Sequence, residues 1–177
     1  ITLFLTAIID FIKEKYRTKI EMQKLVFHRK TDAVEKAISW YQEAIDCYRM
    51  MQTACDALEE EYNPTTYNRL EASFAQAGRL YANTSKVLNP IYLYYNFSDI
   101  ETKYDIQHSW EYINYAVKEL GRIDQIILEL YNQGLTDEND QIKTLRTKAL
   151  DILKKFAVAI NVQITIITEI MSKLREE

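Results

Sequence analysis

Residues 34–62, which read VEKAISWYQEAIDCYRMMQTACDALEEEY, contain the pattern that decides the fold class. Apolar and aromatic side chains recur there at alternating steps of three and four residues: Val34, Ala37, Tyr41, Ala44, Tyr48, Met51, Cys55, Leu58 and Tyr62. This spacing places one continuous apolar stripe along an α-helix, as at the a and d positions of a coiled-coil heptad. The stretch therefore predicts a long helix that packs against other helices.

The first predicted helix extends over about residues 3–62, because this span contains neither Gly nor Pro. Asn63 and Pro64 end it and begin the next helix, since Asn is a good N-cap and Pro suits the first helical position. The second predicted helix covers residues 64–89. Pro90 ends it, because the residue before a proline disfavours α geometry.

Two further helices are predicted in the second half of the chain. Ser98 and Glu101 match a capping box, which predicts a helix that begins at Ser98. Gly134 is placed to adopt the left-handed conformation that ends helices. Acidic residues then predict a last helix over about residues 137–173, since they are favoured in a first turn.

The composition agrees with an all-α fold. The 177 residues include only three Gly and two Pro, the residues that sheets and long loops need for their turns. Apolar residues make up 47% and charged residues 27%, a balance typical of one folded domain. Because the predicted connections are short, we expect an antiparallel up-down four-helix bundle with an extended N-terminal helix.

The predicted helix lengths leave the start of the chain without a partner. Counted back from the hinge near Gly134, the last helix ends beside Leu25 of the first helix. Residues 1–24 then project from the bundle by roughly 36 Å at 1.5 Å per residue. We therefore divide the chain into a projecting segment, 1–24, and a bundle domain, 25–177.

The projecting segment combines apolar and basic residues. Residues 1–12, ITLFLTAIIDFI, are mostly apolar, and residues 13–30 contain seven Lys or Arg against two Glu, a net charge of +5. The whole chain has a net charge of −4, so residues 31–177 carry −8. The candidate membrane or partner contacts are Leu3, Phe4, Ile8, Ile9, Phe11, Ile12, Lys13, Lys15, Arg17, Lys19 and Lys24.

Three interpretations of this segment stay open. It is the inner end of a membrane helix, and the positive-inside rule then places the bundle in the cytoplasm, at the face of the membrane. It packs against a second copy or another protein. It folds back as a fifth short helix. The apolar run by itself is too short to span a bilayer, which needs about 20 residues.

The stretch between the second and third predicted helices is unusually aromatic. Tyr92, Tyr94, Tyr95 and Phe97 form a candidate contact loop that anchors at a membrane interface or binds a partner. The alternative is that the four rings plug the open end of the bundle.

No motif in the chain identifies a reaction, cofactor or metal. Asp105 and His108 have the spacing of one carboxylate–histidine pair, but a di-iron bundle needs such pairs on facing helices. Cys47 and Cys55 have no nearby His and are interpreted as buried small apolar residues. Asp124, beside the apolar face of its helix, is expected at a rim position that faces water.

These observations favour a non-enzymatic interaction or regulatory module, held at a membrane or in a larger assembly by its N-terminal helix. A protein partner or self-association is expected, and no small-molecule ligand can be assigned. Nucleic-acid binding is disfavoured, because the basic charge is confined to one segment of an acidic chain. Two alternatives remain: an extracytoplasmic sensor bundle between two membrane helices, and a small helical enzyme or toxin with an unrecognised site.

Overall fold

The computed structural model describes residues 2–60, 64–104 and 106–176, with side chains described from residue 11 onward except at 64 and 65. Over these ranges the chain is helical and contains no strand. The elements are α1 (Thr2–Glu60), α2 (Pro64–Tyr81), α3 (Thr84–Leu88), the 3-10 helix η1 (Asn89–Leu93), α4 (Ser98–Lys103), α5 (Ile106–Asn132) and α6 (Asp140–Arg175). The predicted all-α class is confirmed.

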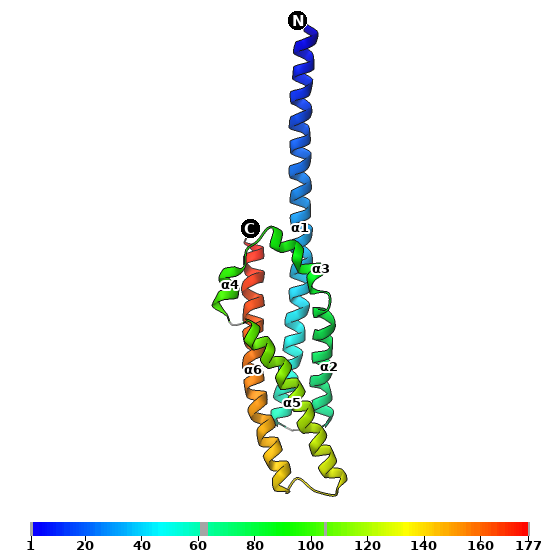
Figure 1. Cartoon of the computed structure of the whole chain (residues 1–177), viewed down its shortest axis with the longest axis vertical. Helices are drawn as coiled ribbons and strands as arrows, with labels where there is room; N and C mark the ends of the chain where they lie inside the picture. The colour runs from blue at the N-terminus through cyan, green and yellow to red at the C-terminus, as the bar shows by residue number, and fades with distance from the viewer. Residues whose placement is uncertain (1, 61–63, 105, 177) are drawn as a thin grey trace.

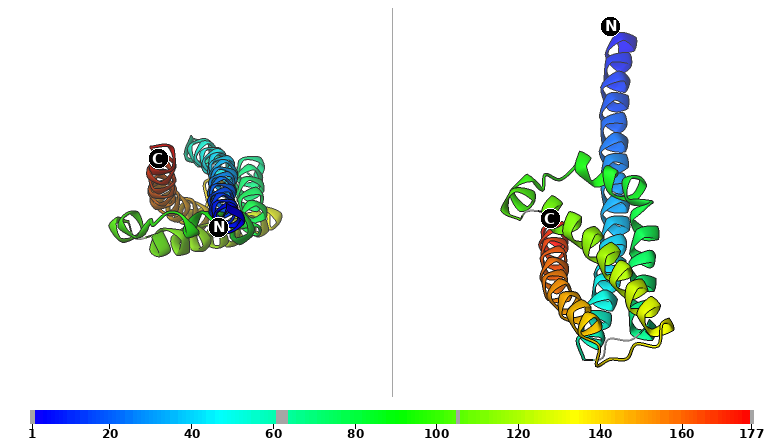
Figure 2. Two further views of the ribbon diagram at one scale, coloured as in Figure 1. Left: turned by 90° about the horizontal axis from the view of Figure 1, so that it is seen from above. Right: turned by 60° about the horizontal axis from the view of Figure 1, so that its bottom comes forward.

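Helix α1 is the axis on which the other helices are arranged. It packs against α2 on one side and α6 on the other, and successive long helices run in opposite directions (Figure 1). Helix α5 runs obliquely, from α6 at one end of the body toward α2 at the other (Figure 2). The N-terminal part of α1 projects well beyond all the other helices (Figure 1).

The seam read from the sequence forms the centre of the core. Tyr48, Met51, Cys55 and Leu58 are completely buried, and Tyr41 is 3% exposed. Burying a side chain of this size stabilises the fold by about 2 kcal/mol. Helix α1 is therefore stabilised mainly by its apolar stripe, and the predicted long first helix is confirmed.

The predicted helix over residues 64–89 is broken. Helix α2 ends at Tyr81, and α3 begins at Thr84 after a two-residue turn. The amide of Asn83 donates to the carbonyl of Leu80 at 3.2 Å, and the Thr84 hydroxyl donates to the carbonyl of Tyr81 at 2.8 Å. The Thr84 hydroxyl thus takes the carbonyl of the last residue of α2, and such side-chain bonds compete with the helical ones.

The capping box predicted at Ser98 does not form. Ser98 lies inside α4, and its amide donates to the side chain of Asn96 at 2.9 Å. Glu101 instead accepts a hydrogen bond from the Tyr92 hydroxyl at 3.4 Å. The extended backbone of Tyr104 then separates α4 from α5. The Asn96 side chain makes the local turn instead, so Ser98 is the first residue of α4 and not its N-cap.

The turn between α5 and α6 follows the prediction closely. Gly134 has a φ of +83°, and the amide of Leu135 donates to the carbonyl of Leu130 at 3.1 Å, as in a Schellman motif. Helix α6 begins three residues later than predicted, because Asn139 is its N-cap. The Asn139 side chain accepts from the amide of Gln141 at 2.9 Å. The predicted cap at Asn63 lies outside the described residues.

Asp124 corrects another prediction. Its side chain is buried rather than at the rim, with an exposed fraction of 7%. Burial raises the pKa of its carboxyl, and the negative charge of Glu71 raises it further. Asp124 faces inward because α2 packs over this part of α5, which the spacing on one helix does not reveal.

We predict that position 121 must be glycine because the Tyr67 hydroxyl occupies the space of a Cβ there. A Cβ at position 121 would lie 2.6 Å from the Tyr67 Oη but 3.6 Å from its Cζ. Gly121→Ala in a Tyr67→Phe background should raise the free energy of unfolding by about 1 kcal/mol, the helix propensity gain. In the wild-type background this gain should be lost. Urea unfolding of the four proteins tests this, and an equal gain in both backgrounds would contradict it.

We also predict a pH-dependent contribution from Glu119. Arg122 at 2.8 Å and Lys148 at 2.5 Å lower the pKa of its carboxyl to about 2. Because the pKa of Glu119 is lower in the folded chain than in the unfolded chain, its carboxylate stabilises the fold at pH values above about 4.5. This stabilisation is lost as the pH falls from about 4.5 toward 2. Glu119→Gln should lower the free energy of unfolding by about 1 kcal/mol at pH 7.

The difference in free energy of unfolding between Glu119→Gln and wild type should shrink steadily as the pH falls from about 4.5 toward 2, measured by urea unfolding at several pH values. Asp151→Asn is the matched control, because Asp151 pairs with Lys155 on one helix and both side chains are exposed. The control should change the free energy of unfolding little at any pH. A Glu119→Gln effect that is constant with pH would show that the prediction is wrong.

Candidate functional site

The projecting part of α1 is the most unusual surface of the molecule. Every side chain from Phe11 to Arg29 is exposed, and the first buried one is Ala33. Eight of the exposed side chains are large and apolar: Phe11, Ile12, Tyr16, Ile20, Met22, Leu25, Val26 and Phe27. Phe11 is 69% and Phe27 66% exposed. We call residues 11–29 the projecting segment from here on.

The structure places seven of the eleven predicted contact residues on this exposed surface: Phe11, Ile12, Lys13, Lys15, Arg17, Lys19 and Lys24. The side chains of Leu3, Phe4, Ile8 and Ile9 lie outside the described residues. Helix α1 is continuous from Thr2 to Glu60, so the structure does not fold the segment back as a fifth short helix. The domain boundary at residue 24 stays a prediction.

Sequence reasoning missed the exposed apolar residues closest to the body. Leu25, Val26 and Phe27 lie within the part assigned to the bundle, and Ile20 and Met22 were passed over among the lysines. These residues alternate with Lys, Glu and Gln, so the segment does not stand out as apolar in the composition. Their spacing along the helix was the available signal.

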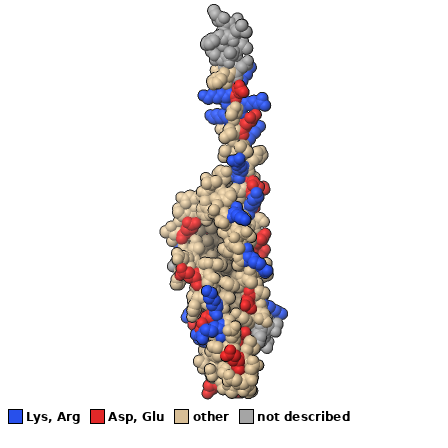
Figure 3. Space-filling model, turned by 45° about the vertical axis from the view of Figure 1, so that its right-hand side comes forward, with Lys and Arg blue, Asp and Glu red and all other residues tan. Residues whose placement is uncertain are grey.

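Basic side chains gather on the projecting segment. Figure 3 shows Lys and Arg spread around the exposed helix, with fewer Asp and Glu among them. Arg17 forms an ion pair with Glu21 at 3.0 Å. Among the described residues, the structure shows no ion pair for Lys13, Lys19 or Lys24. The net positive charge of this segment is therefore available to a partner.

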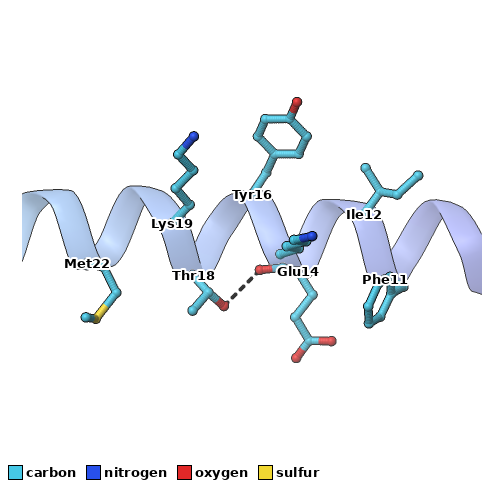
Figure 4. Close-up of a pocket in the computed structure, with 8 residues that line it drawn as sticks. Phe11, Ile12, Glu14, Tyr16, Thr18, Lys19 and Met22 are labelled. Atoms are coloured by element: carbon cyan, nitrogen blue, oxygen red, sulfur yellow. Dashed lines mark hydrogen bonds between the residues drawn. The ribbon is translucent and has the colours of Figure 1, made fainter.

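The projecting segment does not enclose a cavity. Figure 4 shows Ile12 and Tyr16 on one side of the helix and Phe11 and Met22 on the other. The only hydrogen bond drawn there is local, from the Thr18 hydroxyl to the carbonyl of Glu14 at 2.9 Å. Such a surface suits a macromolecular partner rather than an enclosed small molecule.

The aromatic loop is mostly turned into the body. Phe97 is 1% and Tyr95 7% exposed, and their rings stack with centroids 6.1 Å apart. The Lys30 ammonium lies 4.7 Å from the centre of the Tyr95 ring, which joins this loop to the base of the projecting segment. Tyr94 is half-buried and Tyr92 largely exposed. Tyr95 and Phe97 thus pack as the plug interpretation expects.

The candidate chemical groups of the sequence are placed as follows. The described residues contain no group of three or more His, Cys, Asp or Glu side chains that would hold a metal, and Asp105 lies outside them. Cys47 and Cys55 are buried as predicted, and burial raises the pKa of both thiols. A groove of about 490 Å³ between α5 and α6 includes His108, but its Lys155 is paired with an aspartate.

Comparisons with protein family models, with curated proteins and with solved structures found no match. In the described part of the chain, no helix is long and apolar enough to cross a membrane. The exposed surface of α1 is therefore the main observation from which a function can be inferred.

We predict that the aromatic loop stabilises the body. Phe97→Ala should lower the free energy of unfolding by about 3 to 5 kcal/mol, because it leaves a cavity under the loop. Leu93→Ala, in the same loop but 79% exposed, should change it by less than about 0.5 kcal/mol. Urea denaturation followed by far-UV circular dichroism measures both. Similar small effects of the two substitutions would contradict a structural role for the loop.

Proposed function

We propose that this protein is a non-enzymatic interaction or regulatory module, and that the projecting segment attaches its helical body to a larger assembly or to a membrane. One observation supports this proposal above all. A continuous helix leaves eight large apolar and several basic side chains exposed over residues 11–29. Exposed apolar surface gathered on one segment is typical of interaction sites.

The energetics of an isolated helix support the same proposal. The side chains of the projecting segment are all exposed, and most helical stability in proteins comes from tertiary packing of an apolar face. Its stability therefore depends on its continuity with the packed part of α1. A partner that covers the apolar side chains would stabilise the segment and contribute binding energy of about 25 cal/mol per Å² of apolar surface removed from water.

The body is proposed to act as a rigid support. We interpret α1, α2, α5 and α6 as an antiparallel up-down bundle with coiled-coil-like packing along α1. Packing of α1 against both α2 and α6 supports this interpretation. The bundle would hold the base of the projecting segment in a fixed direction.

A cytoplasmic location, at a membrane face or in an assembly, is part of the proposal. Basic residues directly follow the apolar N-terminal run, as at the cytoplasmic end of membrane helices. The two cysteines are free and buried, which agrees with a reducing compartment.

The test compares full-length chains in lysates of the native host. In the attachment variant, Phe11, Ile20 and Phe27 are each replaced by Gln. The wild-type chain should sediment with membranes or elute within a complex, and the attachment variant should elute as a free chain. The matched control replaces Leu93, Tyr115 and Val158 by Gln, because these apolar residues are equally exposed but lie on the body.

The control should behave as the wild type does, and thermal unfolding should show that all three bodies are equally stable. Suppose that the attachment variant and the wild type have the same sedimentation and elution profiles. Attachment through the projecting segment would then be wrong. If the control also elutes as a free chain, the attachment surface lies on the body instead.

A further inference from the structure

The buried seam of α1 continues into the projecting segment. Ile20 and Phe27 precede Val34, Tyr41 and Tyr48 at the same seven-residue spacing. Tyr41 and Tyr48 are 3% and 0% exposed. The hydroxyl of Tyr48 lies 2.8 Å from that of Tyr81 of α2. Ile20 and Phe27 are 49% and 66% exposed. The same helical stripe is thus covered in the body and uncovered outside it.

The second set of seam positions also continues from the body into the projecting segment. Tyr16 and Gln23 precede Lys30, Ala37 and Ala44 at seven-residue spacing. Lys30 lies over the Tyr95 ring and marks the edge of the body. We call Tyr16, Ile20, Gln23 and Phe27 the open seam. A polar residue such as Gln23 among apolar seam positions is a common way to fix the register of paired helices.

The charged residues at the positions that flank the open seam are all basic, and the remaining flanking position, Val26, is apolar. Arg17 and Lys24 lie on one side of it, and Lys19 lies on the other. These are the e and g positions of the heptad, which face a paired helix and select its charge. Glu14 and Glu21 lie at b positions, away from the seam, but Glu21 pairs with Arg17 at 3.0 Å. The flanking charges on which the inference rests are therefore those of Lys19 and Lys24.

We propose that the open seam binds an amphipathic helix of a partner protein, with acidic residues beside its own apolar stripe. The inference rests on the proposed function and names the class of partner. The apolar stripe in heptad register specifies a helix, and the basic flanks specify the sign of its charge. Electrostatic complementarity of this kind selects the partner and its orientation.

A second copy of the chain is a poor occupant of this seam. In a parallel pair, Lys19 faces Lys24 of the second copy. In an antiparallel pair, Lys19 faces Lys19, and Arg17 or Lys24 faces Arg17 or Lys24. Each arrangement places like charges in contact along the seam, which disfavours self-pairing.

A lipid surface matches the segment less well than a helix does. An interfacial helix gathers its apolar residues on one face. Here Phe11 and Met22 lie on the opposite side of the helix from Ile12 and Tyr16 (Figure 4). A helix on the open seam also leaves Phe11 and Met22 uncovered, but the heptad spacing of the seam matches a paired helix and not a flat bilayer surface.

The test measures binding of two designed peptides to the full-length chain by fluorescence anisotropy. Both peptides are four heptads long, with Ile and Leu in the stripe, and they carry either Glu or Lys at all flanking positions. The Glu peptide should bind at least about tenfold more tightly, because its acids face Lys19 and Lys24. Its affinity should fall between about 50 and 300 mM NaCl, since salt screens exposed charges.

Charge reversal supplies the decisive comparison. Lys19→Glu with Lys24→Glu should reverse the preference toward the Lys peptide. Lys15→Glu with Arg29→Glu changes the net charge equally but lies away from the seam, so it should leave the preference for the Glu peptide intact. The inference is overturned if the peptides bind equally, if neither binds, or if both charge-reversed chains respond alike.

Two parallel measurements separate this inference from the proposed function. The chain is mixed with vesicles of phosphatidylcholine and phosphatidylserine, and its mass is measured by sedimentation. Vesicle binding or a dimer that is lost in Ile20→Gln, without discrimination between the peptides, would overturn the acidic-helix partner but leave attachment through the projecting segment standing. Attachment through the projecting segment fails if the attachment variant keeps the wild-type profile in lysate, or if the body control loses the complex equally.

Discussion

The structure depends on the burial of one stripe of α1 between α2 and α6. Tyr48, Met51 and Leu58 are inaccessible to water because both neighbouring helices pack on them. This packing holds the second half of α1 in a fixed position, and it stabilises the whole helix by providing a formed core from which further turns extend. The projecting segment is helical without tertiary contacts of its own, because extending a helix that already exists is far easier than nucleating a new one.

Aromatic contacts connect the remaining helices to this stripe. The ring of Tyr81, at the end of α2, packs edge-on against Trp40 with centroids 5.0 Å apart and lies 4.9 Å from Trp110 of α5. Its hydroxyl is 2.8 Å from that of Tyr48. One side chain thus joins three helices at the position where α2 ends. The helix break and the aromatic cluster occur together, because α3 and η1 turn there to cover the top of the core.

One stripe of α1 is buried in the body and exposed in the projecting segment. From Tyr41 onward the seam of α1 is buried, and before Val34 the same seam is exposed. A helix that needed only to complete the body would end where its neighbours end. The open part combines apolar side chains at heptad spacing with flanking cations such as Lys19 and Lys24, a chemistry suited to recognition rather than to catalysis. The body supplies the direction in which this surface is presented.

By itself, the sequence determined the helical class, the length of α1, the left-handed turn at Gly134 and the burial of the cysteines, because each depends on local periodicity or local backbone chemistry. Only the tertiary structure decided that Asp124 and Phe97 are buried, and that α2 and α5 are shorter than their apolar patterns predict. It also showed that Ile20 and Phe27 are exposed although they continue a core seam. A stripe on one helix has the same spacing whether or not a neighbour covers it, so exposure is decided by where the neighbouring helices end.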